Sequence, residues 1–276
     1  LFGFGAKAGM VPLHIWLPKA HTVAPAPASA LLSGILTKSG IYGILVITCN
    51  LFLYDMPWGK LVVWIGVITM LSGAVLAVFS VDLKRTIACS SMSQIGFILV
   101  GIGMQVLIGH ENALSAAGTV LHMINHALIK MVLFVAAGVV YRGTHSLNLN
   151  VVRGFANDRP RLAAVFTIGA LSICGVPLFS GYVSKTLLHE SIVEYIHLLE
   201  HEGLPAGPYQ LIEGLFLFAG GLTVAYMTKL FVALCVDPKM PGHHVPPAQY
   251  MDDPTFAALG IGALLIVVLG TTPHAS

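Results

Sequence analysis

The feature that most restricts the fold of this chain is the run of residues 61–81, which contains no charged side chain. A helix needs about 20 apolar residues to cross the hydrocarbon core of a bilayer, so this run is long enough to span it. Only 9% of the residues are charged, whereas a soluble domain carries about 25%. The mean hydropathy of +0.85 likewise indicates a membrane protein. The sequence therefore predicts an all-α, polytopic membrane helix bundle.

Composition also excludes several classes of function. The formal net charge is +2, and no basic stripe or acidic tail is present, so we expect no nucleic-acid partner. The four cysteines are isolated, with no CxxC spacing, which argues against an iron–sulfur cluster, a zinc site or a disulfide framework. We therefore expect neither a metal nor a cofactor on this chain.

Apolar runs predict about seven to eight transmembrane helices. The chain starts inside an apolar run and without Met, so we expect one or more membrane segments upstream. The segments run as follows: the end of one helix at 1–11, then 28–53, 61–81, 86–108, 113–141, 162–199, 211–236 and 255–272.

The segment 162–199 is too long for one straight crossing and short for two. Because Lys and Arg favour the cytoplasmic side, charge in the connections can decide between them. With one broken crossing, alternate connections hold nearly all of the basic residues: Lys19; Lys84 and Arg85; Arg142, Arg153, Arg159 and Arg161; and Lys239. The intervening connections contain only Lys60. We therefore predict one broken crossing, with the loops after residues 11, 81, 141 and 236 in the cytoplasm.

Two short stretches interrupt the helical pattern in a similar way. The sequences GMVPLHIWLPK (9–19) and CGVPLFSGYVSK (174–185) share Val-Pro-Leu followed by a lysine. Proline removes a backbone donor and clashes with the preceding turn, which predicts broken helices near 9–18 and 174–181. Irregular backbone at membrane depth survives only inside protein or beside a watery cavity. Paired breaks of this kind indicate a transport site.

Several basic side chains lie where the chain is otherwise apolar. A lysine at the bilayer centre costs roughly 2.5 to 3.5 kcal/mol, so these groups should face protein or water. Burial disfavours the charged amine, and histidine titrates near neutrality, so together they can pass protons. We predict a proton relay with no catalytic or cofactor-binding residue, composed of Lys7, Lys38, His122, His126, Lys130 and Lys185, with Lys229 as a possible addition.

The spacing of His122, His126 and Lys130 is i, i+4 and i+8, which places them on one helix face, about 6 Å apart along the axis. Two histidines at i, i+4 can also bind zinc, but no HExxH glutamate and no obvious third ligand accompany them. Three of the lysines have alternative, purely structural roles. Lys229 lies near a polar loop and could extend to the interface. Lys7 could do the same, and Lys185 could cap its broken helix.

Four stretches together resemble one family. They are GAKAGMVPLHIWLPKAHTVAPAPASALLSGILTKSGIYGIL, DLKRTIACSSMSQIGFI, HMINHALIKMVLFVAAG and GVPLFSGYVSK. They resemble the antiporter-like membrane subunits of respiratory complex I, of membrane-bound hydrogenases and formate hydrogenlyase-type complexes, and of Mrp sodium/proton antiporters. The resemblance covers nearly the whole chain, with the motifs in the family's order.

The resemblance implies two inverted repeats, each with a broken helix. Residues 1–53 would be the end of the first half-channel repeat, 61–236 the second, and 255–272 an additional helix. Lys7 and Lys38 match the family's lysines at and after the first break. His122, His126 and Lys130 match its central stretch, and Lys185 matches its terminal lysine. A glutamate on an earlier helix, which pairs with the lysine matched by Lys7, lies outside this sequence.

The resemblance also implies the function. The chain would translocate protons as a multi-pass, non-catalytic subunit of a redox-driven complex in the cell's inner (plasma) membrane. Its partners would be the bilayer, other membrane subunits and, indirectly, a peripheral redox arm of the NADH-quinone oxidoreductase or hydrogenase type. A sodium/proton antiporter subunit of the Mrp type is the alternative. A third possibility, from the histidine spacing, is an intramembrane metalloenzyme at His122 and His126.

Overall fold

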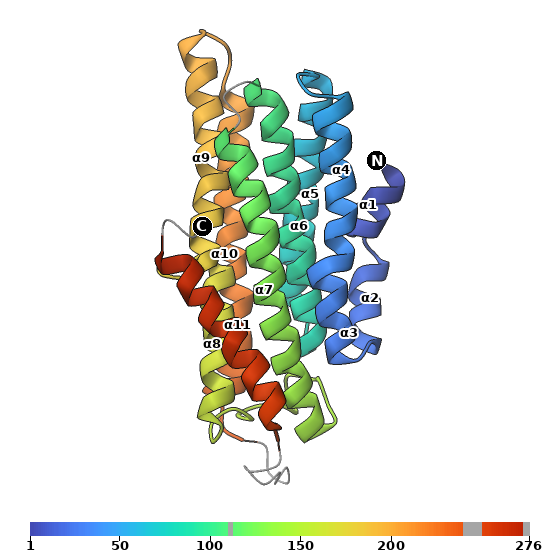
Figure 1. Ribbon diagram of the computed structural model, residues 1–276, viewed down its shortest axis with the longest axis vertical. Coiled ribbons are helices and arrows are strands. Elements are labelled where there is room, and N and C mark those ends of the chain that lie inside the picture. The colour runs from blue at the N-terminus through green and yellow to red at the C-terminus, as the bar shows by residue number, and fades with distance from the viewer. Residues whose placement is uncertain (110–112, 240–249, 273–276) are drawn as a thin grey trace.

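The computed structural model describes residues 1–109, 113–239 and 250–272, which form one bundle of helices (Figure 1). The elements in chain order are α1 (Phe2–Ala8), α2 (Trp16–Val23), α3 (Ala26–Leu31), the π-helical turn η1 (Leu32–Leu36), α4 (Thr37–Leu51), α5 (Met56–Phe79), α6 (Leu83–Ile108), α7 (Ala113–Thr144), α8 (Pro160–Cys174), α9 (Ser180–His201), α10 (Gly207–Cys235) and α11 (Asp253–Thr271).

Within the described residues, six helical segments are long and apolar enough to cross a membrane: 26–51, 56–79, 83–108, 113–144, 207–235 and 253–271. They confirm the predicted all-α membrane bundle. The helices α8 and α9 follow one another along the long axis of the bundle, as one broken crossing requires (Figure 1). The predicted start at residue 113 agrees with α7, and the other starts are corrected by two to five residues, because capping and proline positions, and not hydropathy, set where helices begin.

The start of the chain also needs a correction. The first helix ends at Ala8, and residues 16–23, predicted as part of a break and a loop, form helix α2. Pro18 lies in the first turn of α2, where backbone N–H groups have no partner within the helix, so it does not disrupt the helix. Lys19 therefore lies on an exposed helix surface and not in a connection.

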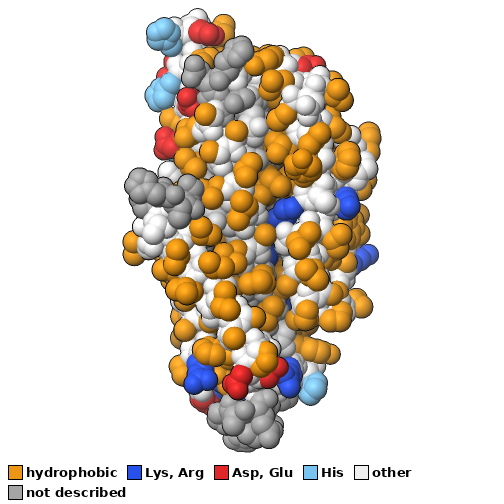
Figure 2. Space-filling view, viewed as in Figure 1, with side chains coloured by type: hydrophobic (Ala, Val, Ile, Leu, Met, Phe, Trp, Pro, Cys, Tyr) orange, Lys and Arg blue, Asp and Glu red, His pale blue; other side chains and the backbone are white. Residues whose placement is uncertain are grey.

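Backbone hydrogen bonds join three of the predicted cytoplasmic connections at one end of the bundle. Leu83 N donates to Leu147 O over 2.8 Å, and Gly154 N donates to Ala233 O over 2.9 Å. The loops after residues 81, 141 and 236 thus share one end, as the alternation of basic residues predicts. Charged side chains gather at both ends of the molecule, with a mainly apolar surface between them (Figure 2). The cytoplasmic assignment of the arginine-rich end remains a prediction.

Helices α5 and α6 pack with their backbones nearly in contact. A Cβ atom on Gly73 would lie 2.4 Å from Ser93 N, and one on Gly96 would lie 2.3 Å from Met70 N. Small residues allow such close approach in membranes, where packing and not hydrophobic burial drives association. Apart from Arg85 in its first turn, α6 is buried along its length and forms the central helix of the bundle.

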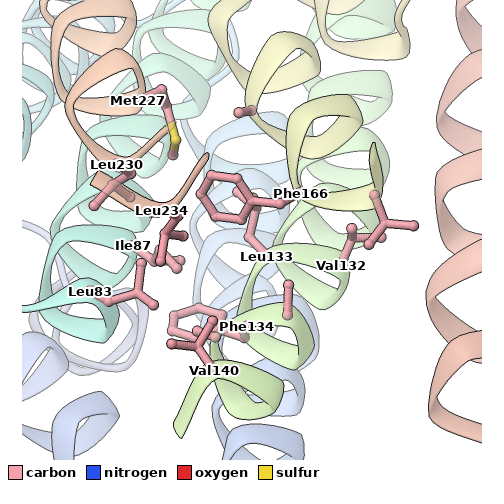
Figure 3. Close-up of a cluster of buried hydrophobic side chains, with 14 of the residues drawn as sticks. Leu83, Ile87, Val132, Leu133, Phe134, Val140, Phe166, Met227, Leu230 and Leu234 are labelled. Atoms are coloured by element: carbon pink, nitrogen blue, oxygen red, sulfur yellow. The ribbon is translucent and has the colours of Figure 1, made fainter. Parts of the chain in front are cut away.

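The largest hydrophobic cluster lies towards the arginine-rich end, between α6, α7, α8 and α10. Figure 3 shows Leu133 of α7 beside Phe166 of α8, with Leu230 and Leu234 of α10 in the same cluster. On α7, Leu133 follows Lys130 by three residues, so the cluster continues from the basic row towards this end of the helix. It holds α7 in one orientation, and that orientation positions the candidate site.

Candidate functional site

The two predicted breaks are present and have the same backbone design. Helix α1 ends at Gly9 (φ 78°) and α8 ends at Gly175 (φ 80°), both in the left-handed conformation that glycine adopts without strain. Met10 N donates to Gly5 O, and Val176 N donates to Leu171 O, each over 3.1 Å. These are Schellman caps, and the proline of each Val-Pro-Leu then prevents the helix from continuing.

The second break places Lys185 inside the protein. Its Nζ atom donates to the carbonyl of Ile173 in the last turn of α8 over 2.7 Å, so the amine crosses the break. Nζ also lies 4.9 Å from the centre of the Phe97 ring. Only 9% of Lys185 is exposed. Lys185 therefore does cap the broken helix, and this contact holds its amine within the membrane-spanning region.

Helix α7 carries the predicted basic row on its buried face. Exposure is 2% for His122, 1% for His126 and 0% for Lys130, as their i, i+4 and i+8 spacing requires of one face. The two imidazole rings lie nearly parallel, with centroids 6.3 Å apart. A single water can bridge groups at this separation.

Lys38 joins this row from α4. Its Nζ atom is 2.5 Å from His126 Nδ1 and 2.5 Å from the carbonyl oxygen of Ser33. Ser33 lies in the π-helical turn η1, and its carbonyl also accepts from the Thr37 hydroxyl over 3.0 Å. Such turns often occur at functional sites. The sequence predicted Lys38 but not the π turn that orients it.

His122 links the row to the second break. Its Nδ1 is 2.9 Å from Ser184 Oγ, and its Nε2 is 3.1 Å from Gln94 Oε1. Ser184 directly precedes Lys185, so α7 and α9 are coupled at this point. The row of buried polar groups thus extends from α4 across α7 to α9.

Lys130 occupies the other end of the α7 row. Its Nζ donates to the carbonyl of Ile87 over 2.8 Å and to the hydroxyl of Ser90. The neighbouring Ser91 hydroxyl is 2.9 Å from that of Ser33, close to Lys38. Serines of α6 therefore lie beside both lysines.

Sequence reasoning missed these partners, although one signal was available. Helix α6 is enclosed on all sides, yet it carries a polar run within its apolar sequence: Ser90, Ser91, Ser93 and Gln94. Polar side chains in a fully buried helix must find hydrogen-bond partners. The predicted position of Lys84 was also wrong. It was expected in a connection, but it lies in the first turn of α6, is buried, and donates to the Ala24 carbonyl.

Two predicted relay residues lie apart from the row. The place of Lys7 in the relay remains a prediction. Lys7 lies in the last turn of α1 and is exposed on the surface of this chain. The reason is that α1 packs on α4 through one side, where Gly40 meets the α1 backbone, and its other side is open. Lys229, for which extension to the interface was the alternative, donates to the Ala77, Val78 and Ser80 carbonyls at the end of α5.

The charge of the site is unbalanced. Lys38, Lys130 and Lys185 are all buried, and no Asp or Glu is buried among the residues that the structure describes. The described ion pairs involve partly exposed side chains outside this row. Without buried counterions, a proton on one amine repels protons on its neighbours, so their protonation states are coupled. In the same described ranges, no three His, Cys, Asp or Glu side chains form a group that could hold a metal ion.

Comparison with known proteins identifies relatives of this chain. Residues 1–199 match the family described as "NADH:quinone oxidoreductase/Mrp antiporter, TM". The chain is 35% identical to hydrogenase-4 component B of Escherichia coli K12 over 277 aligned positions, covering 97% of this chain and 41% of that protein. The chain therefore spans less than half the length of this curated relative.

Two solved structures have the same fold. One is the Mrp complex of Dietzia sp. DQ12-45-1b, with a TM-score of 0.84 and 22% identity, covering 98% of this chain and 55% of the matched chain. The other is an archaeal membrane-bound sulfane sulfur reductase, with a TM-score of 0.83 and 27% identity, covering 98% of this chain and 43% of the other.

Proposed function

The chain belongs to the NADH:quinone oxidoreductase/Mrp antiporter transmembrane family, and we propose that it moves protons across the membrane as a subunit of a redox-driven complex. One observation carries the proposal: the buried row from Lys38 through His126 and His122 to Lys185, with Lys130 beside it. The likeness to hydrogenase-4 component B supports the redox-driven branch.

The row suggests how a proton would travel. A proton on Lys38 Nζ passes to His126 Nδ1, with which it already shares a short contact. The parallel rings of His126 and His122 then exchange it through water, and the Ser184 hydroxyl leads on to Lys185. Lys130 lies one helical turn from His126 and can load the same ring from the other side. These steps move one proton and no electrons.

Coupling to redox chemistry would be electrostatic. We propose that the electron carriers belong to partner subunits, including a peripheral arm, and that this chain contacts other membrane subunits in the plasma membrane. A charge that appears near one amine would displace protons along the row, since the amines have no buried counterion. Moving one charge through 100 mV requires about 2.3 kcal/mol, which a redox reaction can supply.

The test is Lys130→Gln in the intact complex, with Lys60→Gln as the matched control. Lys60 is exposed near the opposite end of the bundle, so its loss should change nothing. In vesicles, Lys130→Gln should reduce redox-driven proton translocation about a hundred-fold. Electron transfer to an artificial acceptor should persist. Wild-type translocation by the assembled Lys130→Gln variant would refute the proposed role.

The same vesicles distinguish the alternative, a sodium/proton antiporter subunit of the Mrp type. Proton movement that needs sodium in the opposite compartment, and that proceeds without electron transfer, would show an antiporter and contradict the proposed redox-driven pump. Proton movement in sodium-free buffer that follows electron flow would support it.

A further inference from the structure

A second group of titratable side chains lies beyond Lys185 and outside the predicted relay. His189 follows Lys185 by four residues on α9, so the two share one face, about 6 Å apart along the axis. His189 Nε2 is 3.1 Å from Glu213 Oε1 on α10, and its Nδ1 is 3.7 Å from Glu190 Oε1. In the sequence, the signal for this group is the spacing of four residues between Lys185 and His189.

A cavity connects Lys185 with His189. It measures about 220 Å³ and is lined by both side chains together with Gly175 at the break and Phe97 and Phe216. One water occupies about 30 Å³ in the liquid, so the space can hold several. The amine and the imidazole supply polar partners for them.

Exposure rises steadily along this group. Lys185 is 9% exposed, and the side chains of His189, Glu213 and Glu190 are 24%, 30% and 51% exposed. The direction is towards the turn between α9 and α10, at the end of the bundle opposite the arginine-rich loops (Figure 1). The group therefore reaches from the enclosed break to the surface.

The charge at this end also suits the release of protons. No Lys or Arg occurs between Lys185 and Lys229, whereas five glutamates do: Glu190, Glu194, Glu200, Glu202 and Glu213. Figure 2 shows acidic and histidine side chains together at this end of the molecule. An acidic surface favours cations and accepts protons that arrive from the interior.

We propose that His189 and Glu213 form the outlet of the proton path, exchanging protons between Lys185 and water at this end. The proposal rests on the proposed proton translocation. Lys185 Nζ loses a proton through cavity water to His189 Nδ1, and the imidazolium passes its Nε2 proton to the Glu213 carboxylate. Glu213 releases that proton to bulk water, and rotation of the ring restores the starting tautomer. One proton moves, and no electron does.

The test compares His189→Gln with His197→Gln in vesicles that contain the intact complex. His197 is a suitable control, since it lies on the same helix, 3.8 Å from Glu200, with a side chain that is 73% exposed. We expect His189→Gln and Glu213→Gln each to slow proton translocation at least about ten-fold, and His197→Gln to leave it unchanged.

A chemical rescue separates a relay from a merely structural role. In His189→Ala, added imidazole can enter the cavity and carry the proton, so translocation should recover with increasing imidazole concentration. Translocation that is lost but not recovered would overturn the outlet, as would wild-type translocation by His189→Gln. A parallel Lys185→Gln variant separates the two proposals: if it also pumps normally, the proposed function fails, and if only it stops pumping, the outlet alone fails.

Discussion

The two broken helices differ in the side chain that crosses each break, although their backbones are alike. At the first break Trp16 Nε1 donates to the Ala6 carbonyl over 2.7 Å. At the second, Lys185 Nζ donates to the Ile173 carbonyl, also over 2.7 Å. Both donors satisfy a carbonyl near the end of the preceding helix, which has no partner within that helix. An indole cannot change its charge, whereas an amine can. The same structural task is therefore performed by a titratable side chain at only one of the two breaks.

The lysines near the breaks differ in the same sense. Val-Pro-Leu is followed by a lysine in both stretches, after eight residues from Val11 and nine from Val176, yet Lys19 is exposed and Lys185 is buried. Side chains of α6 and α10 surround the second break, as Phe97 and Phe216 show. The first break contacts α5 through Val11 N and Thr69 Oγ1, but its outer side is open. Packing around a motif, and not the motif, determines what its lysine can do.

The largest expected effect tests this difference in the lysines. Lys185→Gln keeps a donor for the Ile173 carbonyl but removes the exchangeable charge, so it should lower proton translocation about a hundred-fold. Lys19→Gln, which changes the lysine after the first Val-Pro-Leu, should leave the rate unchanged. Redox-driven acidification in vesicles measures both. Equal losses in the two variants would show that the breaks are functionally equivalent after all.

The next effect concerns how tightly the second break is packed. A Cβ atom on Gly181 would lie 1.9 Å from the Ser172 carbonyl oxygen, so Gly181→Ala should lower the free energy of unfolding by about 2 kcal/mol. Gly214→Ala is the control, since nothing lies within 4 Å of its added Cβ. Thermal unfolding in detergent compares the two. An unchanged midpoint for Gly181→Ala would mean that the backbone at the break moves to accommodate the added methyl group at little cost.

Both glycine caps should lose stability when replaced by alanine. Alanine in the left-handed conformation costs about 1 to 2 kcal/mol, so Gly9→Ala and Gly175→Ala should each destabilise the protein by at least that amount. Gly9→Ala should cost more, because its Cβ would also lie 2.8 Å from Leu17 Cδ2. Only Gly175→Ala should also slow proton translocation, because its Cβ would lie 3.2 Å from Lys185 Cδ. Stability and translocation are measured on the same preparations. A slower rate in both variants would contradict the assigned asymmetry.

The smallest effect concerns the indole at the first break. Trp16→Phe removes the hydrogen bond to Ala6 and should cost about 1 kcal/mol of stability. Proton translocation by the folded protein should stay at the wild-type rate, because an indole neither takes up nor releases a proton. Leu17→Met, a volume-conserving change of a buried neighbour, serves as the packing control. A large loss of translocation in Trp16→Phe would assign the first break a more direct role.

The sequence alone determined the membrane class, the helix order and both breaks. These properties depend on local chemistry: hydropathy over a span, and the backbone limits of Gly and Pro at 9–12 and 175–177. The α7 row was also predictable, because residues four apart lie on one face of any helix.

Only the tertiary structure decided which lysines are enclosed and what each contacts. Lys38 meets His126 across 88 positions of sequence, and Lys229 caps a helix about 150 positions away. Lys7 and Lys185 sit beside similar motifs and have opposite exposure. The physical reason is that burial and charge coupling arise from neighbours on other helices. Their identity follows from how the helices pack, which no local pattern specifies.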